Sequence, residues 1–261
     1  MKDFNLQNAF KAEKMVLIFA GFYPSRYGKK NALLMLSAIV NISITLIQYS
    51  SMLIFIFSNL SDIIKISEVL LYFMTATSFI CKLVNIILQN ENLLKIEEML
   101  QNSLFTKVSI EEEYILKHYI QNGRLSTNIF KVLTALAASF YVVFPLIDGD
   151  SNVKKFSLLS WYPFDQNNYY YEVFLFQAIS IIIVAWFESF IEILFIIMMV
   201  LSRAQFEILK HRLTRIVKHT KENEEGEDDE LVQKRLRRCI IHYNYVLRFV
   251  LHIYLLPTHY L

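Results

Sequence analysis

The most constraining feature of this sequence is a long stretch without any charged residue. From Asn31 to Ser61 the chain contains no Asp, Glu, Lys or Arg. A helix needs about 20 predominantly apolar residues to cross the hydrocarbon core of a bilayer, and this stretch is longer. Because a segment inside lipid must satisfy its own backbone hydrogen bonds, the stretch is expected to be a helix. The chain is therefore predicted to be an integral membrane protein.

The rest of the chain supports this class. Of its 261 residues, 55% are hydrophobic and 19% are charged, whereas soluble domains are about 25% charged. Four apolar segments are long enough to span a membrane, and all five glycines lie outside them. We expect an all-α membrane protein with four transmembrane helices plus a partial fifth helix, and with helices that extend into the cytoplasm. The predicted spans are residues 31–59, 66–89, 126–147 and 172–202.

The segments around these spans define the expected organisation of the chain. Residues 1–30 are predicted to be a cytoplasmic N-terminal segment, and residues 31–202 a four-span transmembrane region. In residues 203–220 apolar positions recur every three or four residues with basic residues between them, which predicts a cytoplasmic amphipathic extension of the fourth span. Residues 221–230 are rich in Glu and Asp and are predicted to be a solvated linker. Residues 231–261 are predicted to begin a fifth helix.

The distribution of Lys and Arg predicts the orientation of the chain. Their number is six before the first span, one in the first loop, four in the second, two in the third and eleven after the fourth span. Basic residues are retained on the cytoplasmic side, so the N-terminus is expected in the cytoplasm. The segment Leu158–Gln177, with eight aromatic residues, then lies outside. Tyr and Trp favour the membrane–water interface, and an interfacial belt explains most of these rings.

The sequence gives little indication of enzymatic chemistry. The six histidines lack the spacing of metal ligands, and no glycine-rich phosphate loop, G-x-S-x-G or C-x-x-C motif is present. Cys81 and Cys239 are interpreted as free thiols. Glu188 and Glu192 lie four residues apart and face one side of a helix, where we expect a polar contact with another cytoplasmic helix. No enzymatic activity, metal, cofactor or nucleic acid is predicted, and the lipid bilayer is the first expected partner.

Three motifs together resemble the insect odorant receptor family. They are WYPFD at 161–165, EILFIIMMVLSRAQFEILKHRL at 192–213 and RRCIIHYNYVLRF at 237–249. The last is similar to the family's CIxHHxxIL stretch, with Tyr243 where a second His is usual. The resemblance implies a seven-span, N-terminus-inside subunit of an odorant-gated cation channel in the plasma membrane. It also implies two partners, a volatile small-molecule ligand and an odorant co-receptor subunit in a hetero-oligomer, expected to be a tetramer.

The resemblance extends to about Arg248. The family has seven spans, the last of which lines the pore, whereas this chain is expected to stop soon after its fifth helix begins. The stretch HIYLLPTHYL at 252–261 is not expected to continue that span, because Pro257 and His259 would lie in its middle. We therefore expect a form truncated on its C-terminal side. Such a form would insert into the membrane but carry no odorant-gated current, alone or with the co-receptor.

The resemblance further implies an odorant pocket among the outer halves of the second, third, fourth and sixth spans. In the predicted orientation these halves are the beginning of the second span, the end of the third and the beginning of the fourth. An apolar pocket with a few polar groups suits a volatile ligand. The implied pocket residues are Val69, Tyr72, Phe73, Ala76, Ala137, Phe140, Tyr141, Phe144, Gln177, Ile181 and Val184.

Other interpretations of the same residues stay open at this point. The sister gustatory receptors share the architecture, although WYPFD and AQFEIL (204–209) favour the odorant branch. A membrane transporter or a helical scaffold is the alternative from another class, with Glu188 and Glu192 on a translocation path. The implied pocket residues could also pack helix against helix without binding a ligand.

Overall fold

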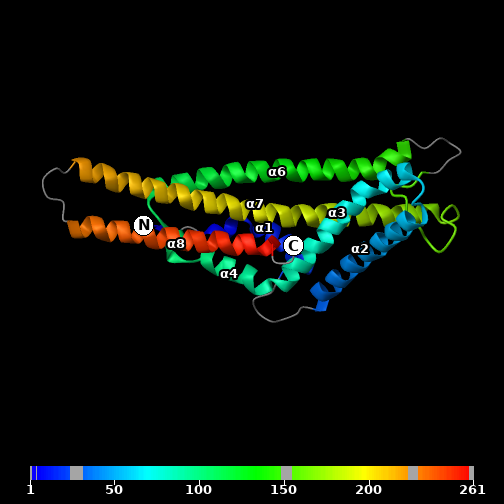
Figure 1. Ribbon diagram of the computed structural model, residues 1–261, viewed down its shortest axis with the longest axis horizontal. Helices are drawn as coiled ribbons and strands as arrows, with labels where there is room; N and C mark the ends of the chain where they lie inside the picture. Colours follow the sequence, from blue (N-terminus) through cyan, green and yellow to red (C-terminus); the bar gives the residue numbers. More distant parts are fainter. Residues whose placement is uncertain (1, 4, 24–31, 148–154, 223–228, 259–261) are drawn as a thin grey trace. The chain divides into compact units, whose positions relative to one another are not determined.

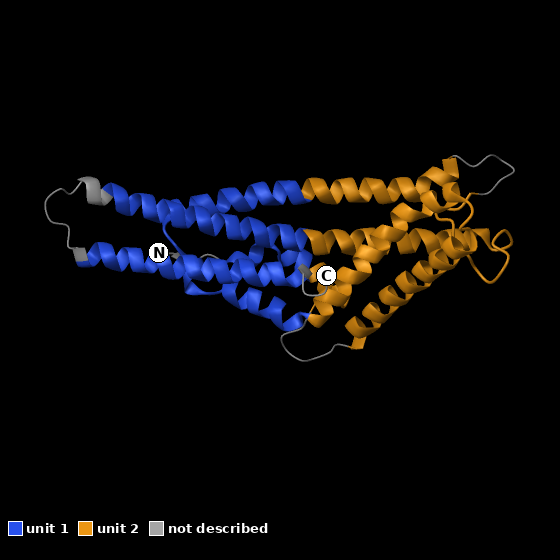
Figure 2. Ribbon diagram, viewed as in Figure 1, with its two compact units in different colours: residues 1–14, 89–127, 193–261 blue, residues 15–88, 128–192 orange. Residues whose placement is uncertain are grey.

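The computed structural model describes residues 2–3, 5–23, 32–147, 155–222 and 229–258. Nearly all of these residues are helical, and five helices are long and apolar enough to cross a membrane (Figure 1). The prediction of an all-α membrane protein is therefore confirmed, with one addition. A pair of two-residue strands lies outside the helices. The chain divides into two compact units, which are coloured separately in Figure 2.

Unit 2 contains residues 15–88 and 128–192. It includes most of α1, all of α2 and α3, the end of α6 and the beginning of α7. The bounds of these helices are α1 Lys11–Phe19, α2 Ala32–Ser58, α3 Ile63–Leu88, α6 Ile110–Ile147 and α7 Tyr170–Glu222.

Burial separates the core helix from the helices at the periphery. In the most apolar stretch of α7, 50% of the residues are buried inside the protein, against 6% in the corresponding stretch of α6 and 11% in that of α2. On α2, Leu33, Leu36 and Ile39 expose more than half of their surface. Because lipid tails are as apolar as these side chains, such exposure is stable in a bilayer. The helices α2 and α6 therefore present lipid-facing surfaces, and α7 supplies the core.

Unit 1 contains residues 1–14, 89–127 and 193–261. Strand β1 pairs antiparallel with β2, with Lys2 opposite Val108 and Asp3 opposite Lys107. The remainder is helical and includes the beginning of α6 and the end of α7. Its other elements are β1 Lys2–Asp3, the 3-10 helix η1 Leu6–Ala9, α4 Asn90–Leu100, α5 Ser103–Thr106, β2 Lys107–Val108 and α8 Asp229–Thr258.

Side-chain caps define where the short elements of unit 1 begin. The Asn102 side chain accepts a hydrogen bond from the Leu104 amide at 3.0 Å and begins α5. Ser109 and Glu112 cap the first turn of α6 reciprocally: the Ser109 amide donates to the Glu112 carboxylate at 2.8 Å, and the Glu112 amide donates to the Ser109 hydroxyl at 3.3 Å. This capping box satisfies amides that the helix itself leaves unpaired.

Several predicted boundaries differ from the structure. The third predicted span, 126–147, is the second part of a helix that begins at Ile110. The fourth span and the 203–220 extension form one helix, α7. The fifth helix, α8, continues to Thr258, so the expectation that residues 252–261 would not continue it was wrong as far as Thr258. Within the predicted linker, α8 already begins at Asp229, and residues 223–228 lie outside the described residues.

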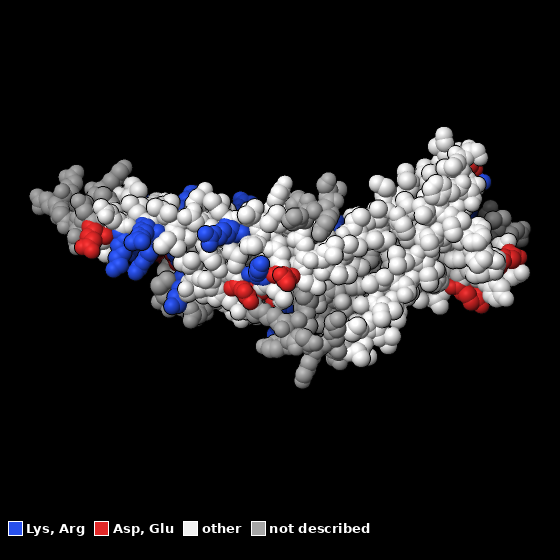
Figure 3. Space-filling view, turned by 60° about the horizontal axis from the view of Figure 1, so that its bottom comes forward, with Lys and Arg blue, Asp and Glu red and all other residues white. Residues whose placement is uncertain are grey.

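Charged side chains follow the division into units. On the face shown in Figure 3, Lys and Arg gather over unit 1, and a broad part of unit 2 is free of charge. Aqueous solvent suits the first surface and hydrocarbon the second. The chain is thus a multi-pass membrane protein, while the sides of the membrane on which its segments lie remain predictions.

Candidate functional site

The implied pocket residues all lie in unit 2, on α3, α6 and α7. On α3, Val69, Tyr72 and Ala76 are buried, with 1%, 5% and 2% of their surfaces exposed. Phe73 is half-buried and stacks on Tyr49 of α2, with ring centroids 4.7 Å apart. The 3- and 4-residue spacing of the three buried positions places them on one helix face. This face of α3 points into the unit.

The α7 residues are equally buried. Gln177, Ile181 and Val184 expose 0%, 2% and 1% of their surfaces. Their spacing again places them on one face of the helix. The structure therefore brings the α3 and α7 members of the implied pocket into the interior of the same unit.

The α6 members are arranged differently. Tyr141 is half-buried, and its ring centroid lies 6.3 Å from that of Tyr72. Phe140 and Phe144 expose 69% and 61% of their surfaces, and Ala137 is also exposed. Among the α6 residues, Tyr141 thus contacts Tyr72 of α3. The other three are exposed on the surface of the described part of the chain. Their role in a pocket stays a prediction.

Two buried hydroxyl groups stand out beside these residues. The Tyr72 hydroxyl and the Ser180 hydroxyl are each fully buried and have no hydrogen-bond partner among the described residues. The two side chains are close enough to interact, although the geometry between their hydroxyls is not that of a hydrogen bond, and the Tyr72 ring lies near that of Tyr141. Ser180 was not among the residues predicted for the pocket, although it lies three residues after Gln177 and four before Val184, on the same helix face. That spacing is the signal that identifies it.

Gln177 has a role that the sequence analysis did not foresee. Its side-chain oxygen accepts a hydrogen bond from the Leu158 amide at 3.1 Å, and its side-chain nitrogen donates to the Leu158 carbonyl at 2.8 Å. Both amide atoms are therefore engaged by the loop that precedes α7. Gln177 therefore fixes this loop with one of its two N–H donors and one of the two lone pairs of its oxygen.

The same loop is attached to α2. The Gln48 side chain donates to the Ser160 hydroxyl at 2.8 Å and accepts from the Tyr162 hydroxyl at 2.9 Å. The Trp161 amide donates to the Ser51 carbonyl at 3.1 Å, and the Ser51 hydroxyl donates to the Trp161 carbonyl. Burial raises the pKa of the Tyr162 hydroxyl, which keeps it protonated as a donor. The loop segment 158–162, which includes the first two residues of the WYPFD motif, thus joins α2 to the start of α7.

The aromatic residues around this motif divide into two groups. Tyr170 is 7% exposed, and its ring packs on Phe156 and Phe174. Trp161 and Tyr171 instead expose 44% and 74% of their surfaces. The second group suits the predicted interfacial belt, and the first contributes to packing.

A charged cluster connects α3 and α7 in unit 2. The Lys82 ammonium lies 3.2 Å from a Glu188 carboxylate oxygen and also contacts Glu192. The contact is therefore made with a span, not with a cytoplasmic helix as expected. Charges within membrane segments are costly unless they are paired, and this pairing accounts for all three residues without a translocation path.

A groove between α6 and α7 lies on other faces of these helices. It has a volume of about 270 Å³, and its lining includes Thr134, Ala138, Val142, Ile182 and Trp186. None of the implied pocket residues lines it. The Thr134 hydroxyl donates to the Phe130 carbonyl at 3.0 Å, so the groove is essentially apolar.

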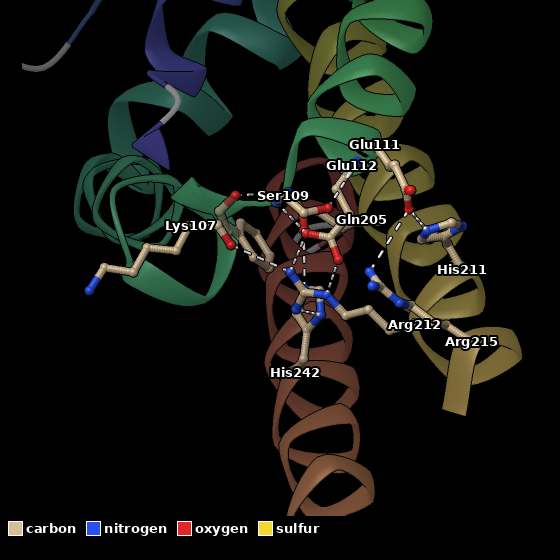
Figure 4. A network of polar contacts seen from close by, with 10 residues as sticks. Lys107, Ser109, Glu111, Glu112, Gln205, His211, Arg212, Arg215 and His242 are labelled. Atoms are coloured by element: carbon tan, nitrogen blue, oxygen red, sulfur yellow. Dashed lines mark hydrogen bonds and ion pairs between the residues drawn. The ribbon is translucent and has the colours of Figure 1, made fainter. Parts of the chain in front are cut away.

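Unit 1 contains a polar network that the sequence analysis did not predict (Figure 4). Arg212 of α7 donates to both carboxylate oxygens of Glu112, at 2.7 and 2.9 Å. Its guanidinium also lies 3.3 Å from His242 Nδ1 of α8. On the other side of the imidazole, Nε2 lies 3.1 Å from the Gln205 side-chain oxygen, and Gln205 donates to the Phe105 carbonyl at 3.4 Å. The network joins α5, α6, α7 and α8.

The chemistry of this network is that of a structural contact. Because a guanidinium only donates, His242 accepts at Nδ1 and donates from Nε2, which is the neutral imidazole. His242 and Phe105 are completely buried, and their rings lie 5.9 Å apart. No group of three His, Cys, Asp or Glu side chains in the described part of the chain could hold a metal ion. We therefore assign the network to the packing of unit 1.

Comparison with known proteins decides the family. The family model described as 7tm Odorant receptor matches residues 62–260, about three quarters of the chain. The chain belongs to the odorant receptor family. No curated protein sequence matches this odorant receptor chain significantly.

Solved structures agree with this assignment at the level of the fold. The insect olfactory receptor OR5 from Machilis hrabei in complex with eugenol is similar to this odorant receptor chain with a TM-score of 0.75 and 14% sequence identity. A second structure of the same receptor gives a TM-score of 0.65 and 15% identity. Each match covers 95% of this chain and 64% of the OR5 chain. The chain therefore spans less than two thirds of that receptor.

Proposed function

We propose that this chain is an odorant receptor subunit that binds volatile small molecules among α3, α6 and α7. Channel activity, together with an odorant co-receptor subunit in the plasma membrane, is proposed for the family member that contains these residues, with the N-terminus in the cytoplasm. The proposal transfers the family's activity to a chain whose described residues contain part of the family's architecture.

The observation that carries the proposal is the burial of the implied pocket faces. Val69, Tyr72 and Ala76 of α3 and Ile181 and Val184 of α7 lie in the interior of one unit. Their surfaces are apolar apart from the Tyr72 hydroxyl, and a site of mainly apolar side chains with few polar groups suits a volatile ligand. The family match supports the odorant assignment. The transporter alternative is less well supported, because Glu188 and Glu192, which it would place on a translocation path, are both paired with Lys82.

Ligand binding by the 261-residue chain in lipid nanodiscs tests the proposal. We expect saturable binding of some members of a panel of volatile compounds. Val69→Phe fills space at a side chain that is 1% exposed and should weaken this binding on the order of 10-fold, because overpacking costs about 1–3 kcal/mol.

The matched control is Val84→Phe, the same substitution on the same helix at a residue that is 49% exposed. It should leave binding unchanged. Failure of the entire panel to bind the well-folded chain would refute the proposal. Equal weakening by both substitutions would place the ligand elsewhere.

A further inference from the structure

The hydroxyls of Tyr72 on α3 and Ser180 on α7 lie close to each other in the interior of unit 2. Tyr72 is 5% exposed and Ser180 is 0% exposed, and neither hydroxyl has a hydrogen-bond partner in the described part of the chain. A buried polar group that lacks a partner is destabilising. Such groups in a native structure call for an explanation, and a role in binding a ligand is one.

Ser180 differs from comparable serines and threonines in the spans. A helical Ser or Thr commonly satisfies its hydroxyl by donating to the carbonyl four residues earlier. Ser189 does so toward Ala185 at 2.6 Å, Thr75 toward Leu71 at 3.0 Å, and Ser139 toward Ala135 at 2.7 Å. Ser180 makes no such bond. Its hydroxyl is therefore available on the side of the helix that faces Tyr72.

The surroundings make these hydroxyls the main polar feature of the site. Val69 and Ala76 on α3 and Ile181 and Val184 on α7 are apolar and buried. Gln177, the other buried polar side chain on this face of α7, already makes two hydrogen bonds to the backbone of Leu158. A hydroxyl can both donate and accept, so two hydroxyls that lie close to each other can bind a single oxygen atom between them.

Building on the proposed function, we propose that Tyr72 and Ser180 form a hydrogen-bonding subsite for one oxygen atom of the volatile ligand. The subsite selects alcohols, aldehydes and ketones over hydrocarbons of the same shape. A hydrocarbon would bury both hydroxyls without a partner, and sites of this kind reject a ligand that lacks the bonding group more strongly than they distinguish one methylene.

Pairs of ligands that differ in one oxygen test the subsite. Dissociation constants of acetophenone and ethylbenzene, and of 2-heptanone and heptane, are measured on the 261-residue chain in nanodiscs. The unsubstituted chain should prefer the ketone of each pair. Tyr72→Phe and Ser180→Ala should each reduce this preference by about 3- to 10-fold, the effect of one hydrogen bond, and leave hydrocarbon binding nearly unchanged. The ratio is taken within each variant, so a difference in the folded fraction cancels.

Ser189→Ala is the matched control, because that hydroxyl already bonds to Ala185; the preference should not change. Thermal unfolding separates the subsite from a packing role. Removing an unpaired buried hydroxyl should not lower the unfolding midpoint.

The outcomes distinguish this proposal from the proposed function. Equal binding of ketone and hydrocarbon would refute the subsite and leave the receptor assignment intact. An unchanged preference in both variants, as expected if a buried water already satisfies the two hydroxyls, would also refute it. If no volatile compound binds, both proposals fail.

Discussion

Arg212 shows how one residue can determine the packing of several helices in unit 1. Its side chain is 24% exposed and its partner Glu112 is 8% exposed. The guanidinium makes two parallel bonds to this carboxylate, a geometry that Lys cannot reproduce. It also donates to the Lys107 carbonyl at 3.4 Å and contacts His242. A single side chain of α7 therefore contacts the beginning of β2, the first turn of α6, and α8.

Arg212→Met should lower the free energy of unfolding of the chain by about 3 kcal/mol, because it leaves the buried Glu112 carboxylate without its cationic partner. Arg215→Met is the control. Arg215 lies 3.9 Å from Glu111, with both side chains more than 60% exposed, and its loss should cost less than about 1 kcal/mol. Chemical unfolding of the purified chain in detergent measures both. Equal effects would show that the network does not stabilise unit 1.

Gln177 gives a second test at the level of the residue. Gln177→Leu should speed hydrogen exchange at the Leu158 amide, because both bonds to that residue are lost within a buried site. Gln166→Leu removes a single bond, to the Ser160 carbonyl, and should leave Leu158 unaffected. Hydrogen exchange read by mass spectrometry compares the two variants. Unchanged protection at Leu158 in the first variant would mean that other contacts fix the loop.

At the scale of the element, α6 shows what the sequence could and could not predict. Its apolar second part was predicted as a span, because a charge-poor stretch of this length is an unambiguous signal. Its beginning at Ile110 was missed, since residues 110–125 are mostly polar. The capping box at Ser109 and Glu112 marks this beginning in the sequence. The start of α6 could therefore have been predicted from this capping motif, although not from hydropathy.

Contacts between elements were harder to foresee than the elements themselves. His242 was interpreted as an isolated histidine, yet it lies between Arg212 and Gln205. These partners are 30 and 37 positions away along the chain, and helical periodicity does not encode such pairings. The faces of α3 and α7 could be predicted because burial follows the helical repeat. The outward direction of Phe140 and Phe144 could not, because in lipid an apolar ring is stable on either side of a helix.

The turn after α1 depends on a glycine. Gly21 has φ of 80°, and a Cβ atom there would lie 2.4 Å from the Leu34 carbonyl oxygen of α2. Gly21→Ala should therefore lower the unfolding free energy by more than about 1 kcal/mol, the cost of the left-handed conformation alone.

Gly123→Ala is the control for this substitution. Gly123 lies within α6, and its added Cβ would meet the Val200 side chain at 3.0 Å. A gain in helix propensity of up to about 1 kcal/mol offsets this contact. Thermal unfolding midpoints in detergent compare the variants, and an unaltered midpoint for Gly21→Ala would contradict the described turn.

At the scale of the whole molecule, the orientation in the membrane rests on the alternation of basic residues between loops. An epitope tag at residue 1 and another within 222–230 should be protected in intact cells. A tag at 150–152 should be labelled from outside. Labelling of the N-terminal tag without permeabilisation would reverse the orientation, and with it the assignment of outer helix halves.

The central claim is that the chain binds a volatile ligand among α3, α6 and α7, and photolabelling tests it most directly. A diazirine analogue of a bound volatile compound is irradiated with the chain in nanodiscs, and the labelled peptides are identified by mass spectrometry. We predict labels in 69–76, 137–144 and 177–184 that excess unlabelled compound removes. Labels concentrated on exposed residues of α2 such as Leu33 and Leu36, and insensitive to competition, would contradict the claim.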